Sequence, residues 1–261
     1  MLDNCPAHLV ALAQRLADAS GSVVRRYFRA PLTITEKADL SPVTAADREA
    51  ESIIRTIIAA QRPGDGVIGE EHGEKNRDAE FVWVIDPIDG TKAFITGRPT
   101  FGTLIGLLHK GRPILGIIDQ PVTGDRWIGA AGRPTTLNGS AAKVRACGSL
   151  AAATLGATTP DMFAGEDAAA FRRLSAAAKF TVYGGDCYAY GLLASGFQDL
   201  VVEADLKLHD FVALAPVITG AGGVMTDWDG RSIDTACDGR VIAAGDARVH
   251  LEALELLAGG R

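Results

Sequence analysis

The sequence predicts a layered sandwich of helices and sheets, of the α/β or α+β class. Three observations predict it: amphipathic helical segments near the N-terminus, short β-branched segments separated by glycine and proline, and alternating helix-like and strand-like segments in the second half. Because every helix and sheet must bury an apolar face, such elements pack as layers. The chain of 261 residues, 47% hydrophobic with a net charge of −6, has the composition of an ordinary globular protein.

Two helices are expected before the first long strand. Residues 7–28 carry apolar side chains at helical spacing, and Pro31 closes the segment. A second helix is expected to begin at Thr44, whose hydroxyl caps it while Asp47 answers three residues later in a capping box. Isoleucines from Ile53 onward supply the buried face of this helix.

The most informative segment follows the apolar strand 81–85. It is the run Asp86, Pro87, Ile88, Asp89, Gly90 and Thr91. Pro87 is expected to stop the strand's ladder, Gly90 permits an unusual backbone dihedral, and Thr91 is expected to start a helix. Two carboxylates, a carbonyl and free N–H groups would then share a small volume. Oxygen ligands suit Mg²⁺ and N–H groups at a helix start suit phosphate, so this run predicts a metal-dependent phosphate site.

The remaining elements are expected in two groups. An antiparallel or mixed meander is predicted over residues 103–108, 113–119 and 127–130. Beyond it, strands are predicted at 155–157 and 200–203, and helices at 168–178, 188–194, 211–220 and 247–257. We expect one domain over residues 1–261, with a seam near 135–150 that divides it into sub-domains 1–140 and 141–261.

Charge and cysteine content restrict the partners and the compartment. An acidic balance without a Lys/Arg block argues against nucleic-acid binding and against anionic membranes, but not against a small anionic substrate. The four scattered cysteines predict free thiols in a reducing compartment. Residues 1–4 show no basic or apolar signal region, and no apolar stretch approaches the roughly 20 residues of a membrane span. A cytoplasmic protein is expected.

Acidic clusters are the candidate functional residues, and each has an ordinary structural alternative. The clusters are Glu70 with Glu71, Asp86 with Asp89, Glu203 with Asp205, and Asp210. Asp-Pro and Asp-Gly pairs are common in surface turns, and Glu70 could be an exposed loop acid. Asp210 could simply cap the helix that follows it. The position directly after a buried strand favours the functional interpretation, because α/β proteins bind ligands at strand carboxyl ends.

Other catalytic and binding motifs are poorly supported. Gly64, Gly66 and Gly69 formally match a dinucleotide-binding fingerprint, but neither a preceding strand nor a following apolar helix accompanies them. Asp86 and Asp89 are three residues apart, whereas a phosphoaspartyl phosphatase needs acids two apart. No G-x-S-x-G elbow is present. The histidines lack a metal-binding pair spacing, so most are expected to be structural or exposed.

Three separated segments resemble the inositol monophosphatase superfamily of Mg²⁺-dependent phosphatases. They are Gly69-Glu70-Glu71, the run from Asp86 to Thr91, and Asp210 with the downstream Ala221-Gly222-Gly223. Their order and spacing fit nearly the whole chain. The resemblance implies a layered αβαβα sandwich of the inositol monophosphatase/sugar phosphatase type, and a phosphomonoesterase that acts through metal-activated water.

The flanking residues narrow the resemblance to one branch. Residues 92–105 and 184–192 look like the histidinol-phosphate phosphatase branch, which serves histidine biosynthesis. The chain departs from that branch at Lys92, where Arg is frequent, and at Phe101, where Trp is frequent. His209 also stands where another aromatic residue is usual. The implied substrate is histidinol phosphate, with inositol 1-phosphate or a related sugar or nucleotide phosphate as the alternative.

The resemblance also implies roles for individual residues. Two or three Mg²⁺ ions would be held by Glu70, Asp86, the Ile88 carbonyl, Asp89 and Asp210. Glu70 and Thr91 would orient and deprotonate the attacking water, and Asp47 would support Thr91 through a hydrogen bond. The substrate would contact Gly90, Thr91, Asp89, Asp186, Glu203 and Asp210, although Asp186 could instead cap the helix after it. A homodimer is implied.

A non-catalytic regulator built on the same fold is the alternative from a different class. It would bind a metal or a phosphate without releasing product. The presence of both Glu70 and Thr91 argues against it, because binding alone does not require a water-activating pair.

Overall fold

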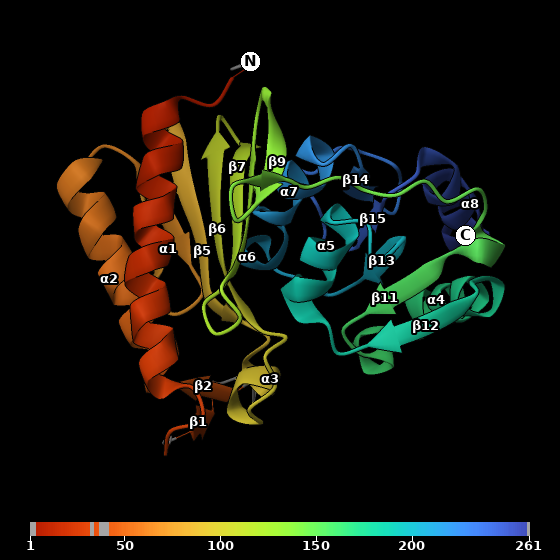
Figure 1. Cartoon of the computed structure of the whole chain (residues 1–261), viewed down its shortest axis with the longest axis horizontal. Coiled ribbons are helices and arrows are strands. Elements are labelled where there is room, and N and C mark those ends of the chain that lie inside the picture. The colour runs from red at the N-terminus through yellow and green to blue at the C-terminus, as the bar shows by residue number, and fades with distance from the viewer. Residues whose placement is uncertain (1–3, 32–33, 37–41, 260–261) are drawn as a thin grey trace.

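Helical and sheet layers alternate through the structure, as the sequence predicts. Figure 1 shows the computed structural model, which describes residues 4–31, 34–36 and 42–259. Helices α1 (Ala7–Tyr27) and α2 (Ala45–Gln61) cover the outer face of the first sheet. Most of residues 1–4, on which the expectation of no signal region rests, lie outside the described residues.

The first sheet has eight strands in the order β10-β9-β8-β7-β6-β5-β3-β4. They are β3 (Gly66–Gly69), β4 (Gly73–Lys75), β5 (Phe81–Asp89), β6 (Gly102–His109), β7 (Arg112–Gln120), β8 (Asp125–Ala130), β9 (Arg133–Leu137) and β10 (Ser140–Ala141). From β5 to β9 each strand runs antiparallel to the next, which confirms the predicted meander, whereas β3 and β5 are parallel. A separate two-stranded sheet pairs β1 (Ile34–Glu36) with β2 (Pro42–Thr44).

The second sheet has five strands in the order β12-β11-β13-β15-β14. They are β11 (Thr154–Ala157), β12 (Phe180–Tyr183), β13 (Leu200–Glu203), β14 (Val224–Asp227) and β15 (Val241–Ala244). Helices α5 (Asp186–Ala194), α6 (Leu208–Phe211) and α7 (Leu214–Gly220) lie between the two sheets. Helices α4 (Gly165–Ala177) and α8 (Ala247–Ala258) cover the outer face of the second sheet. Two 3₁₀ turns, η1 (Leu150–Ala152) and η2 (Pro160–Met162), flank β11.

The described residues form four apolar clusters, and three of them join these layers. One core packs α1 and α2 on the first sheet through residues such as Leu16, Ile54 and Trp83. The central core places Tyr190 and Phe211 between the sheets, and the third packs α4 and α8 on the second sheet. Helices therefore cover both faces of each sheet, which confirms the αβαβα arrangement.

Two local predictions are wrong. Strand β5 continues through Pro87 to Asp89, although its register with β6 shifts between Asp86 and Asp89. Pro87 lacks an N–H, so the ladder is interrupted there while the chain stays extended. The predicted helix 211–220 is divided into α6 and α7.

Other predictions hold within the described residues. The capping box of Thr44 and Asp47 is present at the start of α2, and α3 (Thr91–Ile95) begins at Thr91. The four cysteines are free. Of the helices described, none is both long enough and apolar enough to cross a membrane.

Candidate active site

The end of β5 has the geometry of a tight acidic turn. The Ile88 N–H donates to Asp86 Oδ1 at 3.0 Å, and the Thr91 hydroxyl donates to the Ile88 carbonyl at 3.2 Å. Gly90 has φ +82°, which only glycine adopts readily, and it leads directly into α3. The turn is therefore fixed by hydrogen bonds between its own side chains and backbone.

Asp210 joins the two acids of this turn. One carboxylate oxygen each from Asp86, Asp89 and Asp210 lie within 4.8 Å of one another. The Lys207 N–H donates to Asp210 Oδ2 at 2.7 Å, so Asp210 also caps α6. Asp210 is therefore a first-turn residue inside α6 and not the cap of the helix that follows it, and the same side chain takes part in the acid cluster.

Burial raises the pKa of all three acids, and neighbouring carboxylates raise the pKa of Asp86 and Asp89 further. Burial, followed by the charges of Glu70 and Asp89, raises the pKa of Asp86 well above its ordinary value. Burial and the charge of Asp186 do the same to the pKa of Asp89. Burial is also the main cause of the raised pKa of Asp210. Such a concentration of acids is unfavourable without a cation, which is the electrostatic signature of a metal site.

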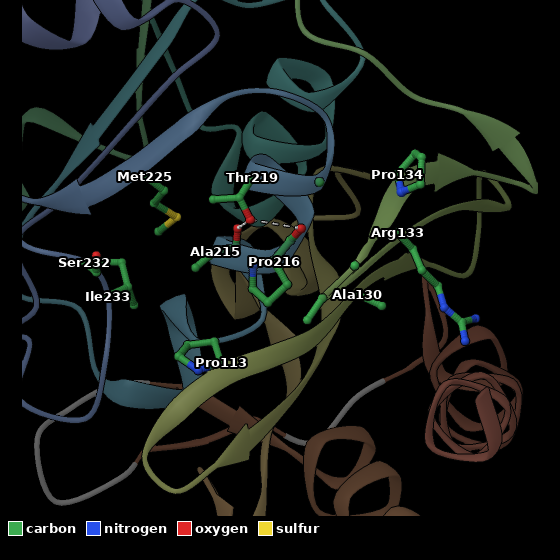
Figure 2. Close-up of a pocket in the computed structure, with 13 residues that line it drawn as sticks. Pro113, Ala130, Arg133, Pro134, Ala215, Pro216, Thr219, Met225, Ser232 and Ile233 are labelled. Atoms are coloured by element: carbon green, nitrogen blue, oxygen red, sulfur yellow. Dashed lines mark hydrogen bonds between the residues drawn. The ribbon is translucent and has the colours of Figure 1, made fainter. Parts of the chain in front are cut away.

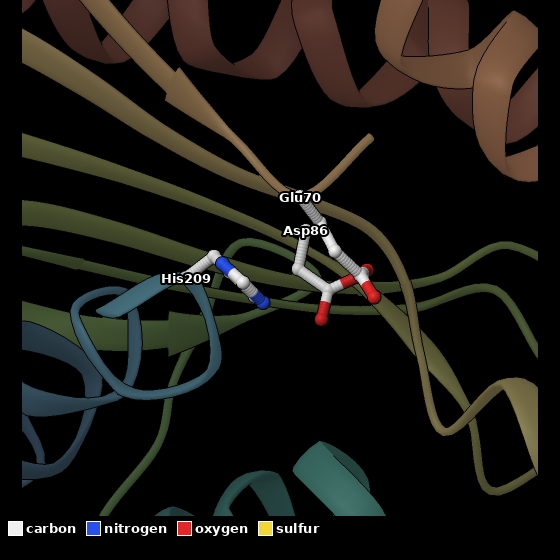
Figure 3. A group of neighbouring side chains, drawn as sticks. All are labelled: Glu70, Asp86 and His209. Atoms are coloured by element: carbon white, nitrogen blue, oxygen red, sulfur yellow. The ribbon is translucent and has the colours of Figure 1, made fainter. Parts of the chain in front are cut away.

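The side chains of Glu70, Asp86 and His209 point toward one another (Figure 3). Gly69 pairs with Ile85 in the parallel ladder of β3 and β5, so Glu70 emerges next to Asp86. Ligand atoms of Glu70, Asp86 and His209 all lie within 4.8 Å of one another. His209 belongs to no predicted site. Its position one residue before Asp210, where the related phosphatases usually have another aromatic, was the available signal.

Glu51 fixes the loop that carries Glu70. Its fully buried carboxylate accepts hydrogen bonds from the Glu71 N–H at 2.7 Å and the His72 N–H at 3.2 Å. Arg55, one turn later on α2, donates to Glu51 at 2.6 Å and also to the Gly73 carbonyl. Sequence reasoning missed Glu51, although it lies on the same helical stripe as the buried Ile54 and Ile58, where a charge is unexpected.

Asp47 and Thr91 do not make the predicted hydrogen bond. Asp47 Oδ2 accepts from the Thr44 N–H at 2.8 Å and from the Thr44 hydroxyl at 2.6 Å. The Thr91 hydroxyl turns to Ile88 instead. Asp47 Oδ1 is buried without a hydrogen-bond partner, and burial raises the pKa of Asp47 to about 6. Helix capping uses Oδ2 of Asp47, and Oδ1 remains able to accept a hydrogen bond.

A small cavity of about 120 Å³ adjoins the acids. Its lining includes Asp89, Asp210, Asp186 and Glu203. Asp186 does not cap α5 with its side chain: its carboxylate accepts from Thr100 at 3.5 Å. Asp89 takes the N-terminal position instead, where its Oδ2 accepts from the Cys187 N–H at 2.6 Å.

Glu203 is held at the back of this cavity. Its carboxylate accepts from the Thr158 N–H at 2.8 Å and from the Tyr190 hydroxyl at 3.0 Å. Burial raises the pKa of Glu203 to about 7 and that of Asp186 to about 6. Asp205, by contrast, points outward and pairs with Lys207 at 3.1 Å.

The donor set fits magnesium. Carboxylates from Glu70, Asp86, Asp89 and Asp210 are hard oxygen ligands, which Mg²⁺ prefers, and the mutual repulsion of the acids favours a cation among them. A larger cavity of about 630 Å³ lies elsewhere, between α7 and strands β7 to β9 (Figure 2). None of the described residues that line it carries a carboxylate, so the chemistry is concentrated at the smaller cavity.

Comparison with known proteins decides the family. Residues 6–259 match the model of the inositol monophosphatase family. The chain belongs to the inositol monophosphatase family. It is therefore a phosphoric monoester hydrolase, and the enzymes of this family depend on Mg²⁺.

Similar proteins are named as phosphatases of different substrates. The chain is 52% identical over 256 residues to the chloroplastic bifunctional phosphatase IMPL2 of Arabidopsis thaliana, covering 95% of this chain and 74% of the relative. It is 36% identical over 222 residues to a histidinol-phosphatase of Chlorobaculum parvum, covering 84% and 86%. The solved structure of an inositol monophosphatase from Zymomonas mobilis matches with a TM-score of 0.89 at 48% identity, covering 97% and 99%.

Proposed function

We propose that this chain is a Mg²⁺-dependent phosphomonoesterase whose main substrate is histidinol phosphate, which it hydrolyses to histidinol in histidine biosynthesis. The observation that carries the substrate assignment is a pair of acids, the half-buried Asp186 and the buried Glu203, which line the cavity beside Asp89 and Asp210. Histidinol phosphate carries an ammonium and an imidazole, whereas inositol phosphate offers neutral hydroxyls. Acids facing the leaving group favour the cationic alcohol.

The metal ligands follow from the acid cluster. Glu70, Asp86, Asp89, Asp210 and the Ile88 carbonyl would hold two or three Mg²⁺ ions. The bound ions supply a water of lowered pKa and stabilise the entering and leaving oxygens of an in-line displacement. Asp86 belongs to both clusters of ligand atoms, so it would help to hold more than one of these ions.

The protein's own groups orient the reactants. Glu70 and Thr91 would orient and deprotonate the attacking water, while the free oxygen of Asp47 would accept from Thr91 once its hydroxyl leaves Ile88. The backbone N–H groups of Gly90 and Thr91 would donate hydrogen bonds to phosphate oxygens at the start of α3. Each oxygen of Glu203 can accept a second hydrogen bond, so the bonds from Thr158 and Tyr190 leave room for a substrate donor.

Inositol 1-phosphate is the second candidate substrate. The 48% identity to the inositol monophosphatase of Zymomonas mobilis favours it, and related sugar or nucleotide phosphates belong to the same alternative. The name of the relative at 36% identity, a histidinol-phosphatase, supports histidinol phosphate, whereas the relative at 52% identity is named as a bifunctional phosphatase without a substrate. The family assignment favours hydrolysis over a regulator that binds without it.

The remaining parts of the proposal concern the form of the enzyme. We propose a cytoplasmic homodimer with a single phosphatase domain over residues 1–261. The first sheet ends at Ala141 and the second begins at Thr154, which supports a division into sub-domains 1–140 and 141–261.

A substrate panel tests the proposal. Phosphate release is measured with histidinol phosphate, inositol 1-phosphate and a nucleotide monophosphate, each with Mg²⁺ and with a chelator. We expect Mg²⁺-dependent release and the highest kcat/KM for histidinol phosphate. Equal or higher kcat/KM for inositol 1-phosphate would overturn the substrate assignment, and binding without release on every substrate would revive the regulator.

A further inference from the structure

His209 places a nitrogen ligand atom where the family resemblance implies only oxygen ligands. A ring nitrogen of His209 lies within 4.8 Å of carboxylate oxygens of both Glu70 and Asp86. Figure 3 shows the outer edge of the ring turned toward these two carboxylates. The side chain is 18% exposed, so the nitrogen is largely withdrawn from solvent but remains reachable.

Nε2 of His209 makes no short hydrogen bond with another described residue. Among the described residues, the polar contact of its Nε2 is with Asp210 Oδ1 at 3.5 Å, longer than a normal hydrogen bond. Asp210 in turn is held by the backbone N–H of Lys207, which fixes the start of α6 and therefore the position of His209. A nitrogen donor is thus held beside two carboxylates by a short helix whose start is capped.

The ligand chemistry of such a set differs from that of an all-oxygen site. Imidazole nitrogen suits first-row metals such as Zn²⁺, Fe²⁺ and Ni²⁺ best. Mn²⁺ also takes carboxylate and water ligands, but it accepts a nitrogen more readily than Mg²⁺, which prefers oxygen and keeps its waters. One nitrogen with two carboxylates therefore raises the affinity for Mn²⁺ more than the affinity for Mg²⁺.

We propose that His209 is a direct ligand of the cation that Glu70 and Asp86 hold, and that it makes this position selective for Mn²⁺ over Mg²⁺. The proposal rests on the metal site of the proposed function, and it adds a ligand and a metal preference to that site. The simpler alternative is that His209 acts as an imidazolium counter-ion to the acids and never touches the metal.

Pulsed electron paramagnetic resonance of the Mn²⁺-loaded wild-type protein distinguishes the two. Protein with ¹⁴N histidine and protein with ¹⁵N histidine are compared, each with Mn²⁺ as the sole added metal. We expect a directly coordinated nitrogen coupling that changes with the isotope. Bound Mn²⁺ without this coupling would overturn the proposal and leave the phosphatase assignment intact. Failure of Mn²⁺ and Mg²⁺ to bind at all would overturn both.

Two variants complete the test. In His209→Phe, which keeps an aromatic ring, we expect the coupling to vanish and the Kd for Mn²⁺ to rise at least about tenfold, the loss that even an outer-shell partner causes. The Kd for Mg²⁺ should change less, because water can replace the imidazole. The matched control is His72→Gln, since His72 bonds Ser52 and the Arg48 carbonyl on the surface of α2. A coupling that persists in His209→Phe, or equal losses for both metals, would contradict the proposal.

Discussion

The carboxylate of Glu51 accepts a hydrogen bond of 2.7 Å from the backbone N–H of Glu71, the residue that follows the metal-ligand candidate Glu70. The same carboxylate accepts from His72 and from Arg55. A fully buried acid on α2 therefore determines the path of the loop between β3 and β4. This relationship connects a residue outside the site with the position of Glu70, and the first two predictions follow from it.

Replacement of Glu51 should loosen that loop. Glutamine offers one acceptor oxygen where three donors converge, so in Glu51→Gln at least one buried donor loses its partner, at a cost of about 1–3 kcal/mol in the free energy of unfolding. We expect faster hydrogen exchange of the Glu71 and His72 amides and a higher Mg²⁺ concentration for half-maximal activity. The control is Glu49→Gln, since Glu49 lies on the same helix and forms an exposed pair with Arg26. Unchanged exchange in Glu51→Gln would contradict the role of Glu51.

Gly69 should tolerate no side chain. A Cβ atom at Gly69 would lie 2.0 Å from Glu51 Oε1, so Gly69→Ala must displace either the acid or the loop. We expect destabilisation of about 1–3 kcal/mol, measured by urea unfolding. Gly64→Ala is the matched control in the same segment, because a Cβ there meets no atom within 4 Å. Equal stabilities for the two variants would show that the close approach to Glu51 is unimportant.

The metal-free protein should lose stability as the pH rises. Burial raises the pKa of Glu203 from 4.5 to about 7, so the folded state binds this proton more tightly than the unfolded state does. The resulting stability is fully present below pH 4.5 and is lost as the pH passes through 7, a loss on the order of 3 kcal/mol. Urea unfolding of the chelated protein between about pH 5 and 8 measures how the free energy of unfolding changes with pH. This range covers most of the interval between the pKa of Glu203 in the unfolded state and its pKa in the folded state.

Glu203→Gln removes the titrating group and serves as the comparison for that change with pH. Its amide oxygen can keep the bond from Thr158, and its amide nitrogen can donate to Tyr190. We therefore expect a folded variant with a flatter dependence of stability on pH. If the variant and the wild type showed the same dependence on pH, the dependence would come from the other acids with raised pKa and not from Glu203.

Asp186 should contribute to the choice of substrate. Its φ of +45° lies in the left-handed region, which asparagine tolerates well, so Asp186→Asn removes the charge without straining the backbone. We expect kcat/KM for histidinol phosphate to fall roughly 10- to 100-fold, the value of a hydrogen bond to a charged group, and kcat/KM for inositol 1-phosphate to change less. Asp161→Asn, at an exposed position, is the control. Equal losses on both substrates would remove Asp186 from the specificity argument.

Local signals predicted much of the fold. The capping box at Thr44 and Asp47 and the helical spacing of residues 7–28 are encoded within a few residues, and both appear in the structure. Strands β12, β14 and β15 were not predicted. Each has only four residues, and β12 and β14 are the edge strands of the second sheet, so their pairing depends on distant partners more than on their own sequence. Pro87 misled the prediction, since a register shift lets β5 continue past it.

The same limit applies to the candidate site. The acids at 70, 86, 89 and 210 were predicted from the family resemblance, and the structure brings their carboxylates together. Glu51 and His209 were not predicted. Glu51 acts on backbone N–H groups twenty residues away, and His209 acquires its neighbours only when α6 packs beside β5, so neither relationship is visible in sequence spacing.

Phosphate release from histidinol phosphate by wild-type protein and Asp86→Asn, over a Mg²⁺ titration, tests the central claim most directly. Asp65→Asn, which also neutralises a buried acid but lies outside the site, is the control. The account predicts Mg²⁺-dependent release by the wild type and the control, and a loss of at least about a thousandfold in Asp86→Asn, where about 4 kcal/mol of metal-based stabilisation disappears. Wild-type release that persists in a chelator, or Asp86→Asn with unchanged Mg²⁺ dependence and rate, would contradict it.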